Sequence, residues 1–159
     1  MLPYSDGQTV RFTNGIVTLN SYVQKETSMM QISNCAGCDI IRQEESITFK
    51  FRVGFNQFVS FSIDNRPDIF LNIFSPEDNY MIGAGFDFKT QPGVALPLCN
   101  APRQSCIGTI SFNGRIYNDV LEIVSGASGQ GELTKAYYNV NKGLIAFRYG
   151  NGMTYSLAD

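Results

Sequence analysis

Apolar and polar residues alternate along most of this chain, and short turn sequences separate the alternating segments. In the clearest segment, Ile47, Phe49, Phe51 and Val53 fall on one side, with polar residues between them. A period of two is typical of a half-buried β-strand, and no long window shows the 3.6-residue period of a helix. The pattern predicts strands at Thr9 to Thr13, Ile16 to Gln24, Ser28 to Ser33, Ile47 to Val53, Phe58 to Ile63, Asp68 to Phe74 and Tyr80 to Phe88. A single helical turn near Asp39 to Glu45 is the one helical candidate.

The C-terminal third is the most regular part of the pattern. Asn113-Gly114 stands between two alternating runs, and this pair tolerates the positive φ angles of a type I′ hairpin turn. Connections this short join only antiparallel neighbours, because a parallel crossover needs a dozen or more residues. The expected strands of this β-meander are Thr109 to Phe112, Arg115 to Val124, Leu133 to Val140, Leu144 to Tyr149 and Met153 to Leu157.

The same stretch carries a family resemblance. Asn113 to Leu121, followed by Ala136-Tyr137-Tyr138, Lys142 to Phe147 and Tyr155-Ser156-Leu157, resembles the end of Gram-negative surface lipoproteins of an uncharacterised all-β family. Their pattern is an "nGk-Y-dV" strand, a "yYa-gvGli-f" hairpin and a final aromatic-x-Leu. The opening Leu2-Pro3-Tyr4, with Gly7-Gln8 and Phe12, resembles their "P-v-G-w-ytn" entry. These motifs are turns and packing aromatics, so the resemblance implies a fold and a location but no activity. The chain departs from the family in having no Trp, with Phe12 and Tyr155 near the two ends.

Length and composition set further bounds. The 159 residues predict a single all-β domain, 1–159, of about ten antiparallel strands that form a strongly curved sheet, an open barrel or a sandwich. No apolar run is long enough for a membrane-spanning helix. The net charge of −2 gives no basic footprint for nucleic acid. The residues Met1 to Asp6 do not form a signal peptide. Either the protein is cytoplasmic or its signal sequence has been removed. The family resemblance and the cysteines favour the second, so we expect an extracytoplasmic protein, in the periplasm or on the outer-membrane surface. A lipid anchor would lie upstream, and the oligomeric state stays open.

Four cysteines fall in two predicted loops, Cys35 with Cys38 and Cys99 with Cys106. Two disulfides suit an even count in an exported domain, and local pairing within each loop closes the shortest rings. A zinc site is the first alternative, although the six residues between Cys99 and Cys106 exceed the usual spacing. Redox chemistry or free thiols are the second alternative, although Cys35 and Cys38 lie between strands and not at a helix N-terminus. The sequence leaves these alternatives open.

Catalytic patterns are scarce. The chain has no His, which removes the common triads, His-ligated metals and His general bases. A carboxylate pair would suffice for glycoside hydrolysis, but no spacing selects a pair. The Gly126 to Gly131 loop lacks the Lys of a phosphate-binding loop. We therefore expect no enzyme activity and no cofactor. The carboxylates considered are Asp64, Asp68, Glu77, Asp78, Asp87, Asp119 and Glu122.

Candidate binding residues lie in one long loop and among the tyrosines. Lys89 to Ser105 holds three prolines, and long ordered loops often carry binding groups. Arg103 beside Cys106 could meet an anionic group, or it is merely solvated while the loop covers the core. Tyr80 and Tyr137 are candidates for a tyrosine face that stacks on sugars or meets a protein. Because Tyr137 and Tyr138 are adjacent on a strand, we expect at most one of them in the core.

Two functional hypotheses follow from these residues. The first is a non-enzymatic cell-envelope lipoprotein domain that binds a protein or glycan partner. The alternative is a β-barrel that carries a small apolar ligand in its mouth.

Overall fold

The residues that the structure describes form antiparallel β-strands. A computed structural model describes residues 4–33, 41–54, 57–64, 68–74, 84–87, 96–97, 103–125, 129–139 and 141–158. It describes the backbone alone at residues 28–33, 41–49, 52, 54, 57–58, 60–64, 68–74, 84–87 and 96–97. The strands are β1 (Thr9–Thr13), β2 (Thr18–Ser33), β3 (Ile41–Gly54), β4 (Gln57–Asp64), β5 (Asp68–Phe74), β6 (Ala84–Asp87), β7 (Leu96–Pro97), β8 (Gln104–Phe112), β9 (Arg115–Val124), β10 (Leu133–Asn139), β11 (Gly143–Tyr149) and β12 (Thr154–Leu157). None of the residues described belongs to a helix.

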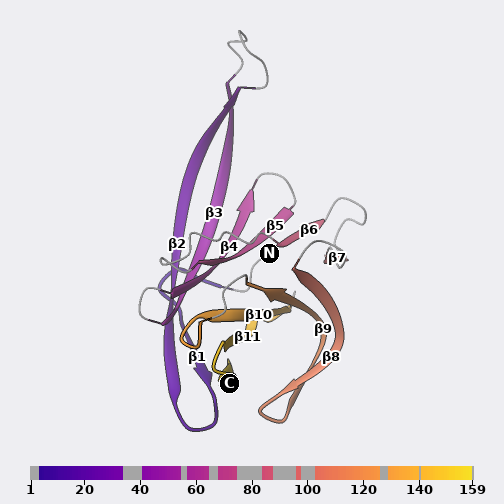
Figure 1. The fold of residues 1–159 in the computed structure, drawn as a ribbon. Coiled ribbons are helices and arrows are strands. Elements are labelled where there is room, and N and C mark those ends of the chain that lie inside the picture. The colour runs from indigo at the N-terminus through magenta and orange to yellow at the C-terminus, as the bar shows by residue number, and fades with distance from the viewer. Residues whose placement is uncertain are drawn as a thin grey trace.

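The strands form one curled antiparallel sheet in the order β7-β6-β5-β4-β3-β2-β1-β12-β11-β10-β9-β8. Apart from β1 beside β12, every neighbour in the sheet is also a neighbour in the sequence, so the predicted meander is confirmed. The pairing of β1 with β12 places Phe12 opposite Leu157 and joins the two ends of the chain. Figure 1 shows the sheet curling into a half-barrel, with β2 and β3 extending beyond it as a long arm. The predicted all-β class and strongly curved sheet are therefore confirmed.

The strand predictions differ from the structure at several places. The two predicted strands, Ile16 to Gln24 and Ser28 to Ser33, are parts of one strand, β2, which begins only at Thr18, so Ile16 and Val17 belong to the turn before it. The helical turn expected near Asp39 to Glu45 is wrong from Ile41 onward, because these residues pair with Met29 to Ser33 in the arm. Pairing with a neighbouring strand overrides weak local helical spacing.

The main hydrophobic cluster joins the two halves of the sheet. Its fully buried members include Phe51 from β3, Phe12 from β1 and Phe147 from β11. Phe147 packs edge-on against Phe12, with ring centroids 5.1 Å apart, and stacks on Tyr155 at 5.5 Å. The Tyr149 hydroxyl donates a hydrogen bond of 2.5 Å to the Val53 carbonyl, from β11 to β3. The curl of the sheet is thus held by side chains that meet across its inner face.

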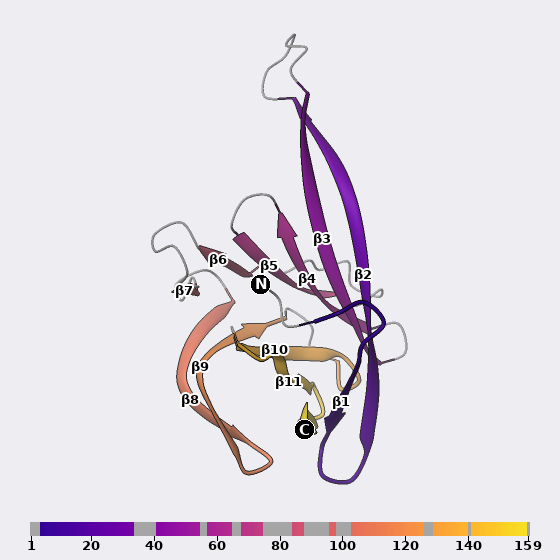
Figure 2. The same cartoon turned by 180° about the vertical axis from the view of Figure 1, so that it is seen from behind.

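A second, smaller cluster lies under the β8–β9 hairpin. The hairpin bends where Gly108 faces Asp119, whose φ of 53° is in the left-handed region that Asp tolerates. Beyond the bend, Phe112 packs against Tyr137 with ring centroids 4.9 Å apart. At the hairpin tip, the Asn113 side-chain amide donates to Ser156 Oγ at 2.8 Å. The hairpin therefore folds back over the face of β10 to β12, as the view from behind also shows (Figure 2).

This second cluster explains why one tyrosine prediction is wrong. Tyr137 and Tyr138 point to opposite faces, as their adjacent positions require, but both are buried, at 5% and 1% exposure. Tyr138 belongs to the main cluster, and Tyr137 belongs to the cluster under the hairpin. Because β8 and β9 cover the other face of the sheet, both faces of β10 are interior.

Candidate binding pocket

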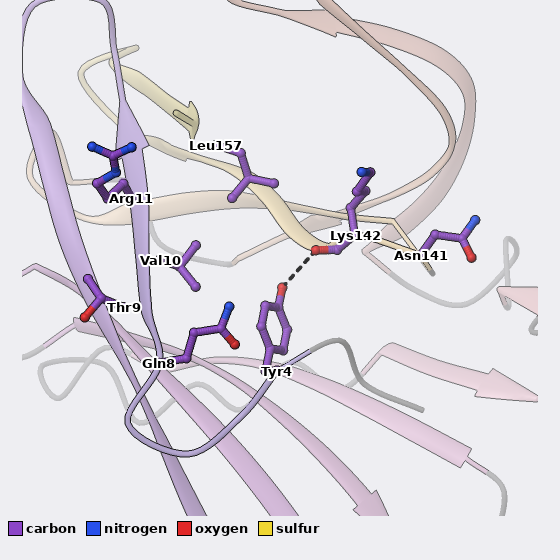
Figure 3. Close-up of a pocket in the computed structure, with 8 residues that line it drawn as sticks. All are labelled: Tyr4, Gln8, Thr9, Val10, Arg11, Asn141, Lys142 and Leu157. Carbon is purple, nitrogen blue, oxygen red and sulfur yellow. Dashed lines mark hydrogen bonds between the residues drawn. The ribbon is translucent and has the colours of Figure 1, made fainter. Parts of the chain in front are cut away.

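A pocket of about 370 Å³ opens where the start of the chain meets the β10–β11 turn. Tyr4 and Gln8 precede β1, and the next three lining residues belong to it. The β10–β11 turn and the end of β12 supply the remainder (Figure 3). The lining residues are Tyr4, Gln8, Thr9, Val10, Arg11, Asn141, Lys142 and Leu157.

The entry to β1 is shaped by a turn around Gly7. Gly7 has a φ of 73°, which suits glycine, and its amide donates to the Val23 carbonyl at 2.9 Å. The Gln8 side-chain oxygen accepts from the Ser5 amide at 3.0 Å, while the Val23 amide donates to the Gln8 carbonyl at 2.8 Å. These bonds fix Gln8 beside the pocket and align the following residues with β2.

The opposite wall is a turn built on Asn139. The side-chain oxygen of this buried residue accepts hydrogen bonds from the amides of Asn141, at 3.0 Å, and Lys142, at 2.9 Å. An Asn side chain that bonds to the backbone two and three residues ahead is a common turn device. Its amide nitrogen donates to the Asn118 carbonyl at 2.8 Å, which anchors the turn to β9. The turn therefore holds Asn141 and Lys142 at the pocket rim.

Tyr4 connects these two walls. Its hydroxyl donates to the Lys142 carbonyl at 3.3 Å and accepts a hydrogen bond from the Leu144 amide. Its ring packs edge-on against Phe51, with centroids 4.6 Å apart. Burial raises the pKa of the Tyr4 hydroxyl far above its usual range, and the hydrogen bond from Leu144 opposes this shift. Tyr4 is therefore uncharged, and its role is to hold the two walls of the pocket together.

The pocket carries more positive charge than the chain as a whole. Arg11 and Lys142 are both exposed, and none of the eight lining residues named above is acidic. The whole chain has a net charge of −2. The remaining exposed lining side chains are the amides of Gln8 and Asn141 and the hydroxyl of Thr9. Hydrogen-bonding groups and two cations thus surround a small apolar surface.

Comparisons of the chain with known proteins found no similar protein. No protein-family model matches this chain, and no curated protein or solved structure matches it either.

Arg103 and Tyr137, two of the residues predicted as binding residues, do not line this pocket. Arg103 is exposed just before β8, with a φ of 64°, and its carbonyl accepts from the Val124 amide at 2.8 Å. Tyr80 lies outside the described residues, as does most of the predicted loop, Lys89 to Ser105, of which Gln104 and Ser105 belong to β8. Tyr137 lies beneath the β8–β9 hairpin. Within the part of the chain that the structure describes, Arg103 and Tyr137 therefore do not contribute to the pocket.

Tyr137 belongs instead to a polar cluster on the β9–β11 face. Its hydroxyl is hydrogen-bonded to the side chains of Glu122 and Arg148. Burial, and next the charge of Glu122, raises the pKa of Tyr137 to about 12. Lys135 Nζ lies 2.9 Å from the Glu122 carboxylate. Glu122, a catalytic carboxylate considered from the sequence, is thus engaged in an ion pair.

The structure describes one of the four cysteines, so it bears only in part on the predicted disulfides and on the alternative zinc site. Cys106 lies in β8 and is disulfide-bonded, while Cys35, Cys38 and Cys99 lie outside the described residues. The predicted pairing therefore stays a prediction. Within the described ranges, no group of three or more His, Cys, Asp or Glu side chains is placed to hold a metal ion.

The sequence did not indicate this pocket, although its two walls lie in motifs of the family resemblance. Gln8 belongs to the opening motif, and Lys142 belongs to the "gvGli" hairpin. The signal that could have linked them is the Tyr4 hydroxyl, whose partner is the hairpin backbone. Nothing in either motif alone shows that they meet.

Proposed function

We propose that this chain is a non-enzymatic domain of a cell-envelope lipoprotein, and that it binds a glycan in the pocket beside Tyr4. The observation that carries the proposal is the pocket lining, in which exposed amide, hydroxyl and cationic side chains surround Leu157. Sugars offer many hydroxyl groups and small apolar ring faces, so they suit such a lining. A volume of about 370 Å³ is within the range of small-ligand sites.

The geometry favours a glycan over the other predicted ligands. Protein interfaces are centred on exposed aromatic and apolar anchors, and the large apolar side chains that are exposed among the described residues lie outside the pocket lining: Ile16, Val17, Tyr22, Ile116 and Met153. An apolar ligand would find only Val10 and Leu157 as aliphatic lining residues, and Val10 is already buried in the main cluster. The side chains of that cluster also occupy the inner face of the sheet between β1–β4 and β9–β12.

The cell-envelope location is supported by the family resemblance. The part of the chain that the structure describes contains no helix long and apolar enough to cross a membrane. We expect the native full-length protein to be in the membrane fraction and to be released from it by detergent, because a lipid anchor would hold it there. Cell fractionation followed by immunoblotting measures this. Recovery from the cytosol with four reduced thiols would contradict the proposed location.

Glycan binding is tested with an array of neutral, carboxylated and sulfated oligosaccharides, followed by calorimetry with the strongest binder. We expect Asn141→Ala to weaken binding by about five- to tenfold, the usual effect of one lost hydrogen bond. Gln130→Ala is the matched control, because Gln130 is an exposed side-chain amide in another loop. The proposal is wrong if no oligosaccharide binds, or if both variants bind as the wild type does.

A further inference from the structure

One residue on the pocket side of β1 has backbone groups that the sheet leaves unpaired. Successive residues of an antiparallel strand direct their N–H and C=O groups to opposite neighbours. The Gln8 carbonyl accepts a hydrogen bond from the Val23 amide, at 2.8 Å, on the β2 side. The Arg11 carbonyl accepts one from the Ala158 amide, at 2.9 Å, on the β12 side. Thr9 follows Gln8 and precedes Arg11 by two positions, so its N–H and C=O groups point to the β12 side as well.

The pocket lies where a strand partner for Thr9 would stand. Within the described residues, the bond from Ala158 to Arg11 is the last one between β12 and β1 in this direction. Thr9 is exposed and lines the pocket together with Leu157 from β12. Among the hydrogen bonds of the described residues, none uses the Thr9 N–H or C=O group. The pocket wall therefore presents a backbone donor and a backbone acceptor side by side.

This open edge is too short for a peptide strand. On one side of it, Gly7 turns the chain, and its amide is bonded to the Val23 carbonyl. On the other side, the Arg11 carbonyl is already bonded to Ala158. A peptide that adds to a sheet gains affinity from a row of backbone hydrogen bonds, and Thr9 alone offers no row. A donor beside an acceptor instead matches two adjacent hydroxyl groups of a sugar ring, because each hydroxyl both donates and accepts.

We infer that the glycan is held by two adjacent ring hydroxyls, one accepting from the Thr9 N–H and the other donating to the Thr9 C=O, with the ring against Leu157. This inference rests on the proposed function of the pocket. Leu157 is half-buried beside Thr9 and offers an apolar surface to the C–H groups of the ring. The contact needs no charge on the ligand, and it excludes sugars in which either hydroxyl is substituted or missing.

Hydrogen exchange of the Thr9 amide in the wild-type protein tests the contact directly. The probes are β-1,4-linked tetraoses of glucose, mannose and galactose. In the free protein this amide should exchange rapidly, because it has no hydrogen-bond acceptor. At saturation with the tightest tetraose we expect its exchange, followed by NMR, to slow by at least about tenfold. Unchanged exchange at Thr9 while the tetraose is bound would show that the backbone of β1 is not the contact.

Deoxy sugars test whether two adjacent hydroxyls are needed. The methyl glycoside of the tightest-binding sugar and its monodeoxy derivatives compete with the tetraose in calorimetry. We expect loss of either member of one adjacent pair to weaken binding by about five- to tenfold, the usual effect of one lost hydrogen bond. Loss of the exocyclic hydroxyl is the matched control, because the neighbouring carbon carries no hydroxyl, and it should change binding by less than about twofold. Equal losses for every derivative would contradict the inference.

A proline variant removes the backbone donor. Thr9→Pro lacks the N–H group but spares the β1–β2 hydrogen bonds, because this N–H points away from β2. We expect it to weaken tetraose binding by about fivefold or more, with Gln130→Ala as the control. If Thr9→Pro does not fold, the exchange of the wild-type amide decides.

The outcomes separate this inference from the proposed function. If glycans bind but the Thr9 amide stays unprotected, the inference is wrong while the proposed function stands. If no glycan binds, both are wrong, and the same holds if only an extended peptide such as acetyl-trialanine amide protects Thr9.

Discussion

Phe147→Ala is expected to lower the free energy of unfolding by about 3–5 kcal/mol, the usual range for removing a buried aromatic ring. Phe147 is fully buried in the main cluster. Its ring lies within 5.9 Å, centroid to centroid, of Phe12, Tyr149 and Tyr155, which come from three strands. Removing it leaves a cavity at the point where the two ends of the chain pack together.

Urea unfolding followed by circular dichroism measures this loss. Tyr22→Ala is the control, because Tyr22 is also an aromatic residue on a strand but is 64% exposed, and we expect a change within about 0.5 kcal/mol. If Phe147→Ala does not fold, Phe147→Leu keeps most of the volume and should cost about 1–2 kcal/mol. Equal stabilities for the Phe147 and Tyr22 variants would show that the main cluster does not hold the sheet together.

Gly143→Ala is expected to destabilise the protein by about 3 kcal/mol and to disrupt the pocket. Gly143 has a φ of 77°, where a side chain costs about 1–2 kcal/mol. In addition, a Cβ atom at this position would overlap the Tyr4 hydroxyl. Tyr4 would have to leave its place against Phe51 and release its hydrogen bonds to Lys142 and Leu144. The buried Leu144 amide would then lose its hydrogen-bond acceptor.

Gly114→Ala is a close control for this variant. Gly114 has a φ of 78°, but a Cβ atom there would meet nothing within 4 Å. We therefore expect only the conformational cost, about 1–2 kcal/mol. The difference between the two variants in the free energy of unfolding, from thermal or urea unfolding, measures how much the docked Tyr4 side chain contributes to the stability of the protein. If the two variants lose the same stability, the overlap with Tyr4 is relieved without cost and Tyr4 does not hold the two walls of the pocket together.

The local sequence determined the strands and most turns of this protein. Alternation places β1, β4 and β9 at or within one residue of their predicted ends, because a period of two needs no knowledge of the partner strand. Asn113 and Gly114 both have positive φ angles, as predicted for the hairpin, because few other residues tolerate that backbone. Short connections between such strands then leave an antiparallel meander as the only order.

Features that depend on distant partners were not determined by the local pattern. The spacing of residues from Asp39 to Glu45 is compatible with a helical turn, but Ile41 to Glu45 are in a strand, because their partner across the arm is not visible in their own spacing. The adjacent positions of Tyr137 and Tyr138 predict at most one of them in the core, yet both are buried, because the β8–β9 hairpin covers Tyr137. Burial depends on what packs against a face, and the period of a strand shows only which residues share one.

The pocket is the clearest case of a feature that only the tertiary structure decided. Gln8 and Arg11 lie near the start of the sequence, Lys142 and Leu157 near its end, and no short-range rule relates them. They meet because β1 pairs with β12 and because the Tyr4 hydroxyl reaches the backbone of the β10–β11 turn. The sequence by itself determined which residues are strands, turns and cations. The curl of the sheet determined which of those cations share a rim, because only long-range pairing brings the two ends of the chain together.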